Sequence, residues 1–186
     1  QPVESLAPNW KGTLSNVNPI SQMLAEEKIR HRICSPSSLA MAVSKIKGLA
    51  DIEANTVWKK LITLCYDLNI NAYGSWPKAI YAASTFGVLG GIEAHADLES
   101  AEKCLELGQP VVCSIDYAKG KLRGAPLAST KGHLVTLIGI EDEQILVMDP
   151  AAPEKSSIAR EYDRKEFEDA WLRNRGAGYY FCVTSE

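Results

Sequence analysis

The stretch 34–41 (CSPSSLAM) constrains the chain most, because it places a cysteine where a loop turns into a helix. Pro36 suits a first helical turn, whose amides lack helical partners anyway. Apolar side chains then recur at three- and four-residue steps, as a buried helical stripe requires: Leu39, Val43 and Ile46. Cys34 is therefore expected at the positive end of a helix dipole, which favours the thiolate and lowers the pKa below the value of about 8.5 for free cysteine. The stretch predicts a nucleophilic thiol.

Two later fragments supply a base and a group that orients it. Residues 132–140 (GHLVTLIGI) are typical of a buried strand that begins beside His133, and residues 145–150 (ILVMDP) of a second strand that ends at Asp149. We expect these strands to form an antiparallel hairpin. Asp149 can orient His133 only if both side chains leave the same face of the sheet.

The register of this hairpin decides whether the two residues meet. We predict His133 directly opposite Asp149, with residues 140–142 as the connection, Asp149 bonded to Nδ1 of His133, and Nε2 facing the Cys34 sulfur. A two-residue turn at 142–143 would instead place Thr136 opposite Asp149. That register sends His133 to the other face unless a bulge intervenes.

Cys, then His, then Asp, with Gln22 shortly before the cysteine, is the chain order of papain-like cysteine peptidases. With this order, the sequence resembles the bacteriocin-processing papain-like hydrolases. The resemblance also rests on the segments 20–23 (ISQM), 73–77 (YGSWP), 110–112 (PVV), 132–133 (GH), 149–150 (DP) and 162–171. These are the double-glycine leader peptidases of peptidase family C thirty-nine and their free-standing bacterial relatives. The resemblance implies an α+β, papain-like fold. Its N-terminal helical half carries Cys34 and packs on an antiparallel sheet carrying His133 and Asp149, with a substrate cleft between them.

The resemblance also implies an activity. Cys34 would attack a peptide or amide carbonyl to form a thioacyl-enzyme, His133 would transfer protons, and Asp149 would fix the imidazole tautomer. The side-chain amide of Gln22 would help to hold the oxyanion. No cofactor or metal is expected. Two alternatives stay open: a catalytically weak peptide-binding module, and an acyl transferase that passes the acyl group to an acceptor other than water.

Two further residues are candidates for the substrate cleft. Ser35 stands where many of these enzymes have glycine, and its side chain would narrow the cleft beside the thiol. Trp76 is either a core aromatic or a wall of the cleft. His31, on the same loop as Cys34, and His95, before a helix that Asp97 caps, are both interpreted as exposed loop residues rather than bases.

Composition excludes several classes of function. A chain of 186 residues with 46% hydrophobic content suits one domain, 1–186, in which 1–19 form an extended lead-in. The net charge of -3 is dispersed, so nucleic acid is not an expected partner; a peptide or protein substrate is. No apolar run approaches the roughly 18 residues of a spanning helix.

The chain starts at Gln1, from which we expect an upstream segment to have been removed and lean towards a secreted or cell-envelope location. Oligomeric state cannot be read from the sequence.

The five cysteines form no C-x-x-C pair, which argues against structural zinc. Apart from Cys34 they interrupt apolar patterns, so we favour buried, reduced thiols, although a disulfide stays possible. These four are Cys65, Cys104, Cys113 and Cys182.

The remaining pattern predicts helices, then strands. Helices are expected over 51–68, from 77 to before Gly87, and over 98–107, followed by a strand at 111–115. Residues 117–131 are expected to form a long loop with a net positive charge. A capping box at 163–166 opens a short helix towards Trp171, and 178–183 form the last strand.

Overall fold

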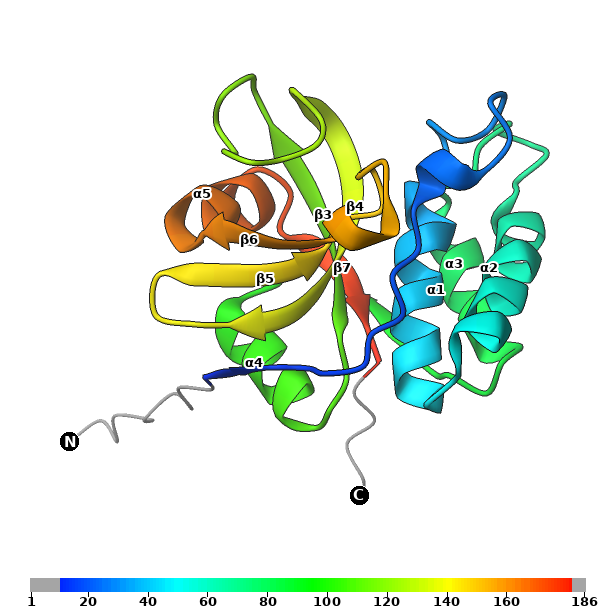
Figure 1. Ribbon diagram of the computed structural model, residues 1–186, viewed down its shortest axis with the longest axis horizontal. Coiled ribbons are helices and arrows are strands. Elements are labelled where there is room, and N and C mark those ends of the chain that lie inside the picture. The colour runs from blue at the N-terminus through cyan, green and yellow to red at the C-terminus, as the bar shows by residue number, and fades with distance from the viewer. Residues whose placement is uncertain (1–10, 182–186) are drawn as a thin grey trace.

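The computed structural model describes residues 11–181, and its N-terminal part is helical (Figure 1). Three helices form this half: α1 (Cys34–Lys47), α2 (Asp51–Cys65) and α3 (Trp76–Ser84). Helix α1 ends as expected for a glycine cap, because Gly48 adopts the left-handed conformation with φ of 64° and donates to the last carbonyls. All three helices start within one residue of the predicted positions.

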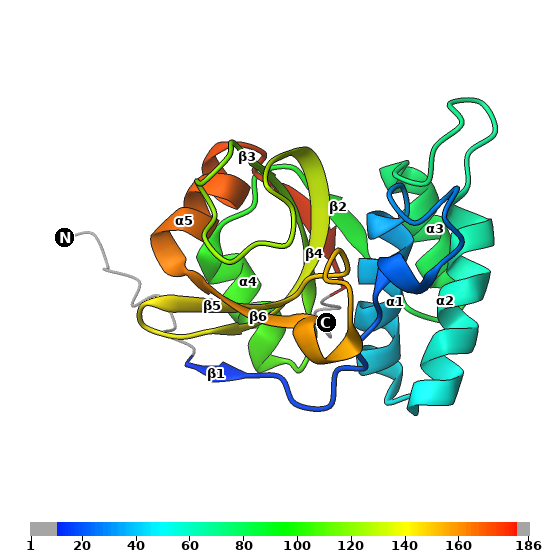
Figure 2. The same cartoon turned by 45° about the horizontal axis from the view of Figure 1, so that its top comes forward.

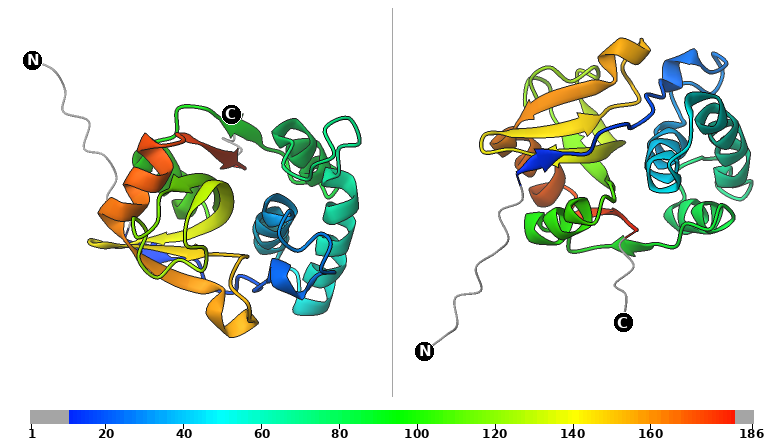
Figure 3. Two further views of the ribbon diagram at one scale, coloured as in Figure 1. Left: turned by 90° about the horizontal axis from the view of Figure 1, so that it is seen from above. Right: turned by 60° about the horizontal axis from the view of Figure 1, so that its bottom comes forward.

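Helix α1 lies between the other two helices and the sheet (Figure 3). Its residues 35–44 are all buried, because one side packs on α2 and the other on the strand that carries His133. Ser38 lies at this second contact, where its Oγ donates to the Leu134 carbonyl at 2.8 Å. The Thr136 hydroxyl donates to the Ser38 carbonyl at 2.9 Å. These bonds fix the start of α1 against the sheet.

A mixed-order antiparallel sheet forms the second half (Figures 1 and 2). In residues 11–181 its central order is β2-β7-β3-β4-β5-β6, and β1 pairs with the far end of β4. The strands are β1 (Gly12–Thr13), β2 (Gly91–Glu93), β3 (Val111–Tyr117), β4 (Thr130–Ile140), β5 (Gln144–Met148), β6 (Ala159–Asp163) and β7 (Ala177–Tyr180). Strand β4 thus lies in the middle of the sheet.

Two apolar clusters cover the two faces of the sheet. One lies between the sheet and α1–α3, and includes Leu39, Val112 and Tyr179. The other lies on the opposite face, against α4 (Leu98–Glu106) and α5 (Arg164–Glu168), with Trp171 fully buried in it. The α+β arrangement of a helical half on an antiparallel sheet, predicted from the sequence, is what the structure has.

The register of the β4–β5 hairpin differs from the predicted one. Glu141 N donates to Gln144 O at 2.9 Å and Ile140 lies opposite Ile145, so the connection is the two-residue turn at 142–143. A bulge then shifts the register between Leu137 and Gly139, which brings Thr136 opposite Met148. The prediction of a three-residue connection is therefore wrong. The bulge restores the parity that His133 and Asp149 need to share a face.

Elements outside the site follow the sequence with small changes. Within the lead-in predicted at 1–19, residues 12–13 form β1, while 1–10 lie outside the described residues. Asp163 caps α5 by accepting from Glu166 N at 3.0 Å, and a π-helical turn, Asp169–Arg173, follows. Short 3-10 helices occur at Gln22–Leu24 and Lys155–Ser157. The last strand ends at Tyr180, and the part of it predicted beyond 181 lies outside the described residues.

Candidate active site

Cys34 is the first residue of α1 and is half-buried. The residue before it, Ile33, caps the helix without a side-chain hydrogen bond, so the first amides of the helix keep their hydrogens for another acceptor. Burial raises the pKa of the Cys34 thiol, but His133 opposes this by hydrogen bonding and charge, with help from the backbone of Leu134 and Ser35. The net result is a pKa below the ordinary cysteine value, which favours the thiolate.

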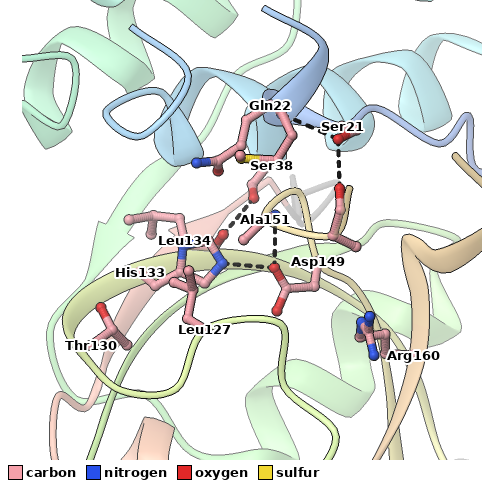
Figure 4. A network of polar contacts seen from close by, with 12 residues as sticks. Ser21, Gln22, Ser38, Leu127, Thr130, His133, Leu134, Asp149, Ala151 and Arg160 are labelled. Atoms are coloured by element: carbon pink, nitrogen blue, oxygen red, sulfur yellow. Dashed lines mark hydrogen bonds and ion pairs between the residues drawn. The ribbon is translucent and has the colours of Figure 1, made fainter. Parts of the chain in front are cut away.

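His133 lies near the start of β4 and is bonded to Asp149, which follows β5 (Figure 4). Its Nε2 is 2.7 Å from Oδ1 of Asp149, and both side chains are buried. The prediction that Nδ1 would face Asp149 is wrong, and the bulge in β4 offsets the two residues diagonally instead of placing them opposite. Nδ1 is therefore the ring nitrogen left to face Cys34.

Asp149 is surrounded by donors. Its Oδ1 also accepts from Ala151 N at 3.0 Å, and its Oδ2 accepts from the Tyr162 hydroxyl at 2.8 Å. Burial raises the pKa of Asp149, but His133, Ala151 and Tyr162 together outweigh burial and lower it. The carboxylate is thus held ionised and fixed in direction. Sequence reasoning did not identify Tyr162, because nothing in the pattern of β6 shows which strand residue reaches Asp149.

The same contacts keep His133 protonated. Burial lowers the pKa of the imidazole, whereas the charge and hydrogen bond of Asp149 and the thiolate of Cys34 raise it, to about 10. A raised His133 pKa and a lowered Cys34 pKa have one physical meaning. Both shifts favour the pair as thiolate and imidazolium over the neutral thiol and imidazole.

Gln22 opens the 3-10 turn and is 4% exposed. It is tied to the segment after Asp149, since Gln22 N donates to Pro150 O at 2.9 Å and the Ser21 hydroxyl donates to Ala152 O at 2.5 Å. Its side-chain Nε2 donates to Arg30 O at 2.7 Å, a carbonyl partner that fixes which end of the amide is nitrogen. The second hydrogen of this amide is free for another acceptor. Figure 4 shows the side chain of Gln22 above Ser38, with His133 below both.

The two cleft candidates have different positions. Ser35 is fully buried and its Oγ lies 2.9 Å from the Tyr179 hydroxyl, so it packs between α1 and β7. The expectation that its side chain narrows a cleft is wrong, because the helix turns residue 35 inward. Trp76 is half-buried and meets the Tyr179 ring edge-on, with centroids 6.4 Å apart. It is a partly exposed aromatic packed beside the core.

The other sequence candidates lie away from this site. His31 and His95 are exposed, as expected. Cys65 and Cys113 are buried free thiols, but Cys104 is disulfide-bonded, contrary to the favoured prediction; Cys182 lies outside the described residues.

Within residues 11–181 no group of three or more His, Cys, Asp or Glu side chains could hold a metal ion. The same part of the chain has no helix both long and apolar enough to cross a membrane.

Comparison with known proteins identifies solved structures of the same fold. A putative C39-like peptidase from Bacillus anthracis has a TM-score of 0.66 at 21% identity, covering 95% of this chain and 100% of the other. A double glycine motif protease from an AMS/PCAT transporter, in complex with the leader peptide, has 0.60 at 18% identity, over 93% and 95%. The peptidase domain of Streptococcus ComA, a bifunctional ABC transporter of a quorum-sensing pathway, has 0.56 at 16%, over 91% and 100%. No curated protein matches the sequence significantly.

The sequence itself matches a family profile over most of its length. The profile is described as "Peptidase_C39 like family" and covers residues 14–179, which include both halves of the fold. The papain-like fold predicted from the sequence is confirmed by the solved structures. The chain therefore belongs to the Peptidase_C39 like family, and by family and fold it is a cysteine peptidase.

Proposed function

We propose that the protein hydrolyses peptide bonds through a thioacyl-enzyme, with Cys34 as nucleophile, His133 as acid and base, and Asp149 as the residue that orients His133. One observation carries the proposal: the imidazole that lowers the Cys34 pKa is held by Asp149 at 2.7 Å in a buried site. A thiolate paired with an imidazolium needs no further activation before it attacks.

In the first half of the reaction the Cys34 sulfur attacks the carbonyl carbon of the substrate. The carbon–sulfur bond forms while the carbonyl oxygen takes up negative charge. His133 then gives its Nδ1 proton to the amide nitrogen as the carbon–nitrogen bond breaks, and the amine leaves. Asp149 stays ionised and keeps Nε2 protonated, so the imidazole offers the correct nitrogen to the reaction.

The second half releases the acid. Neutral His133 takes a proton from water while the water oxygen attacks the thioester carbon. The carbon–sulfur bond then breaks, so that Cys34 returns as a thiolate beside the imidazolium and the carboxylic acid leaves. Cys34 is half-buried rather than enclosed, which leaves a path for peptide and water.

Gln22 supports the oxyanion in this proposal. Its free side-chain hydrogen and the backbone amide of Cys34, at the uncapped start of α1, are donors for the charge that develops on the substrate oxygen. The hydrogen bond to Arg30 and the backbone bond to Pro150 hold Gln22 in place before substrate arrives. A preorganised donor avoids the cost of reorientation during the reaction.

Digestion of a peptide library by wild type and by Cys34→Ala, read by mass spectrometry, tests the proposal. We expect new peptide ends with wild type and none with the variant. A substrate recovered from this library should acylate Cys34, adding the mass of its N-terminal fragment in a rapid acid quench. Equal peptide profiles for the two proteins would contradict the proposal.

The same experiment separates the remaining alternatives. Retention of library peptides on immobilised protein without cleavage would indicate a peptide-binding module. Acyl-enzyme that is discharged by an added amine far faster than by water would indicate a transferase. Hydrolysis in plain buffer, with one free acid per amine released, is the result that the proposal expects.

A further inference from the structure

Arg175 lies in the loop between the π-helical turn and β7, and it is exposed. Two contacts fix its guanidinium: Nε donates to the buried Ser114 hydroxyl at 3.1 Å, and Cζ lies over the ring of Trp76, 5.8 Å from its centroid. Ser114 belongs to the sheet and Trp76 to the start of α3. The arginine thus spans the junction between the two halves of the molecule.

This guanidinium lies beside the backbone that leads into His133. Nη1 lies 3.5 Å from the carbonyl of Lys131, and a Cβ on Gly132 would lie 3.7 Å from Nη2. Gly132 immediately precedes His133 and has no side chain to cover this end of Arg175. On the nucleophile's side, Trp76 packs on Tyr179, whose hydroxyl meets Ser35, the neighbour of Cys34.

The strand order separates Arg175 from the proposed oxyanion donor. His133 is on β4, Gln22 is bonded to the segment after β5, and Arg175 precedes β7 and contacts β3. Because β5 and β3 flank β4 on opposite sides, the contacts of Gln22 and of Arg175 lie on opposite flanks of the strand that carries His133. A peptide bond held at Cys34 between them would bring a nearby substrate side chain to Arg175.

Arg175 also lacks a carboxylate partner within residues 11–181. Several other arginines in this part of the chain have one, among them Arg123 with Glu166, Arg164 with Glu168, and Arg173 with Asp169. Arg175 is held instead by a hydroxyl, a carbonyl and an aromatic ring, none of which neutralises its charge. A fixed guanidinium with an uncovered end is suited to bind a carboxylate, to which it donates hydrogen bonds.

We propose that Arg175 determines specificity by pairing with an acidic side chain of the peptide substrate close to the scissile bond. This inference rests on the proposed function and names its substrate class. Trp76 and Ser114 are positioning residues for the guanidinium, because their contacts hold it at the junction before substrate arrives.

Paired peptides that differ only as Glu or Gln, at each of the three positions on either side of the scissile bond, test the proposal. The parent peptide comes from the library digestion. We expect wild type to favour Glu over Gln in kcat/KM by about three- to tenfold at one or two adjacent positions, and less at high salt. Arg175→Gln should bring this ratio to about one, and Arg175→Glu should favour Lys over Gln there.

Arg173→Gln is the matched control, because Arg173 is a nearby exposed arginine with its own carboxylate, Asp169, at 3.0 Å. It should keep the wild-type ratio. A wild-type ratio near one at every position, or a preference that survives in Arg175→Gln, would overturn the proposal. Thermal unfolding of each variant shows whether it is folded.

A binding arm separates this inference from the proposed function. Fluorescence anisotropy with Cys34→Ala measures the same Glu and Gln peptides without turnover. If wild type cleaves nothing but the Glu peptides bind more tightly than the Gln peptides in an Arg175-dependent way, the hydrolase proposal fails and the Arg175 inference stands. If wild type cleaves peptides but shows no Arg175-dependent preference in either assay, the hydrolase proposal stands and the Arg175 inference is overturned.

Discussion

Cys34 at the start of α1 and Cys113 within β3 both lose water on folding, Cys34 in part and Cys113 fully, but their thiols have opposite properties. Burial raises the pKa of Cys113 well above the ordinary value, the backbone of Leu137 opposes this only in part, and Sγ donates to the Val111 carbonyl at 3.8 Å. Burial also raises the pKa of Cys34, yet His133, with the backbone of Leu134 and Ser35, reverses the shift. The comparison teaches that loss of water makes a thiol inert unless a cation and donors replace it.

Removing His133 should erase this difference and have the largest effect. In His133→Ala, Cys34 keeps its burial but loses the charge that opposes it, so its pKa should rise above that of free cysteine. We expect kcat/KM to fall on the order of ten-thousandfold, since the acid and base of both steps are gone. Steady-state kinetics on a peptide from the library digestion measure this loss.

The control for this variant is His95→Ala, which removes an exposed histidine outside the proposed triad. It should retain wild-type kinetics. Activity of His133→Ala within tenfold of wild type would mean that another group is the base.

Removing Gln22 should separate two contributions to catalysis, the formation of the Cys34 thiolate and the stabilisation of the oxyanion. Gln22→Ala leaves His133 and its contact with Cys34 in place, so the rate of thiol alkylation should stay near that of wild type. Loss of one oxyanion donor should lower kcat by about a hundred- to a thousandfold. A matched variant, Gln109→Ala, removes a glutamine side chain elsewhere and should change neither rate.

The result that contradicts the role of Gln22 is a change of less than about threefold in kcat/KM. A parallel fall in alkylation and turnover would also contradict it, because it would show that Gln22 acts through the thiol or the fold.

Removing the Tyr162 hydroxyl should reduce the difference between the Cys34 and Cys113 thiols indirectly, through Asp149 and His133. In Tyr162→Phe the carboxylate of Asp149 loses the donor at 2.8 Å, so the pKa of Asp149 should rise and its hydrogen bond to His133 should weaken. A hydrogen bond to a charged group contributes about 1.5–3 kcal/mol, so we expect kcat to fall by about tenfold or more. The acid limb of the pH profile should move to higher pH.

Tyr117→Phe is the matched control, since its hydroxyl bonds the Leu127 carbonyl at 3.0 Å instead of a carboxylate. It should leave the acid limb where it is. If the two variants shift the profile equally, Tyr162 supports only the fold and not Asp149.

The place of Cys34 at the start of a helix could be predicted from sequence because its signals are local. A proline in the first turn and an apolar stripe predict α1 and place Cys34 at its start. The same locality explains why the helices α2 and α3 were placed within a few residues. Ser35 was misplaced because the side of a first helical turn that faces the core depends on packing with β7, which a local pattern does not contain.

The relation between His133 and Asp149 was only partly predictable. The apolar runs placed both residues at strand ends, but the two-residue turn and the bulge near Ile138 decided their register, and the rotation of the imidazole decided which ring nitrogen faces Asp149. A bulge adds one residue to one strand and has no fixed sequence signature. Tyr162 and Arg175 were missed for a related reason, since each acts through a residue on another strand or helix.

The most direct test of the account is site-resolved alkylation of the folded wild type with iodoacetamide across pH 5 to 9, read by mass spectrometry. Because the Cys34 pKa is lowered, its thiolate persists below the pH at which an ordinary thiol is protonated. We predict that Cys34 is labelled at pH 6 while Cys113 and Cys65, whose pKa values burial raises, stay unlabelled. Equal labelling of the three thiols at pH 6, or labelling of Cys34 that appears only above pH 8, would contradict the claim that His133 holds Cys34 as a thiolate.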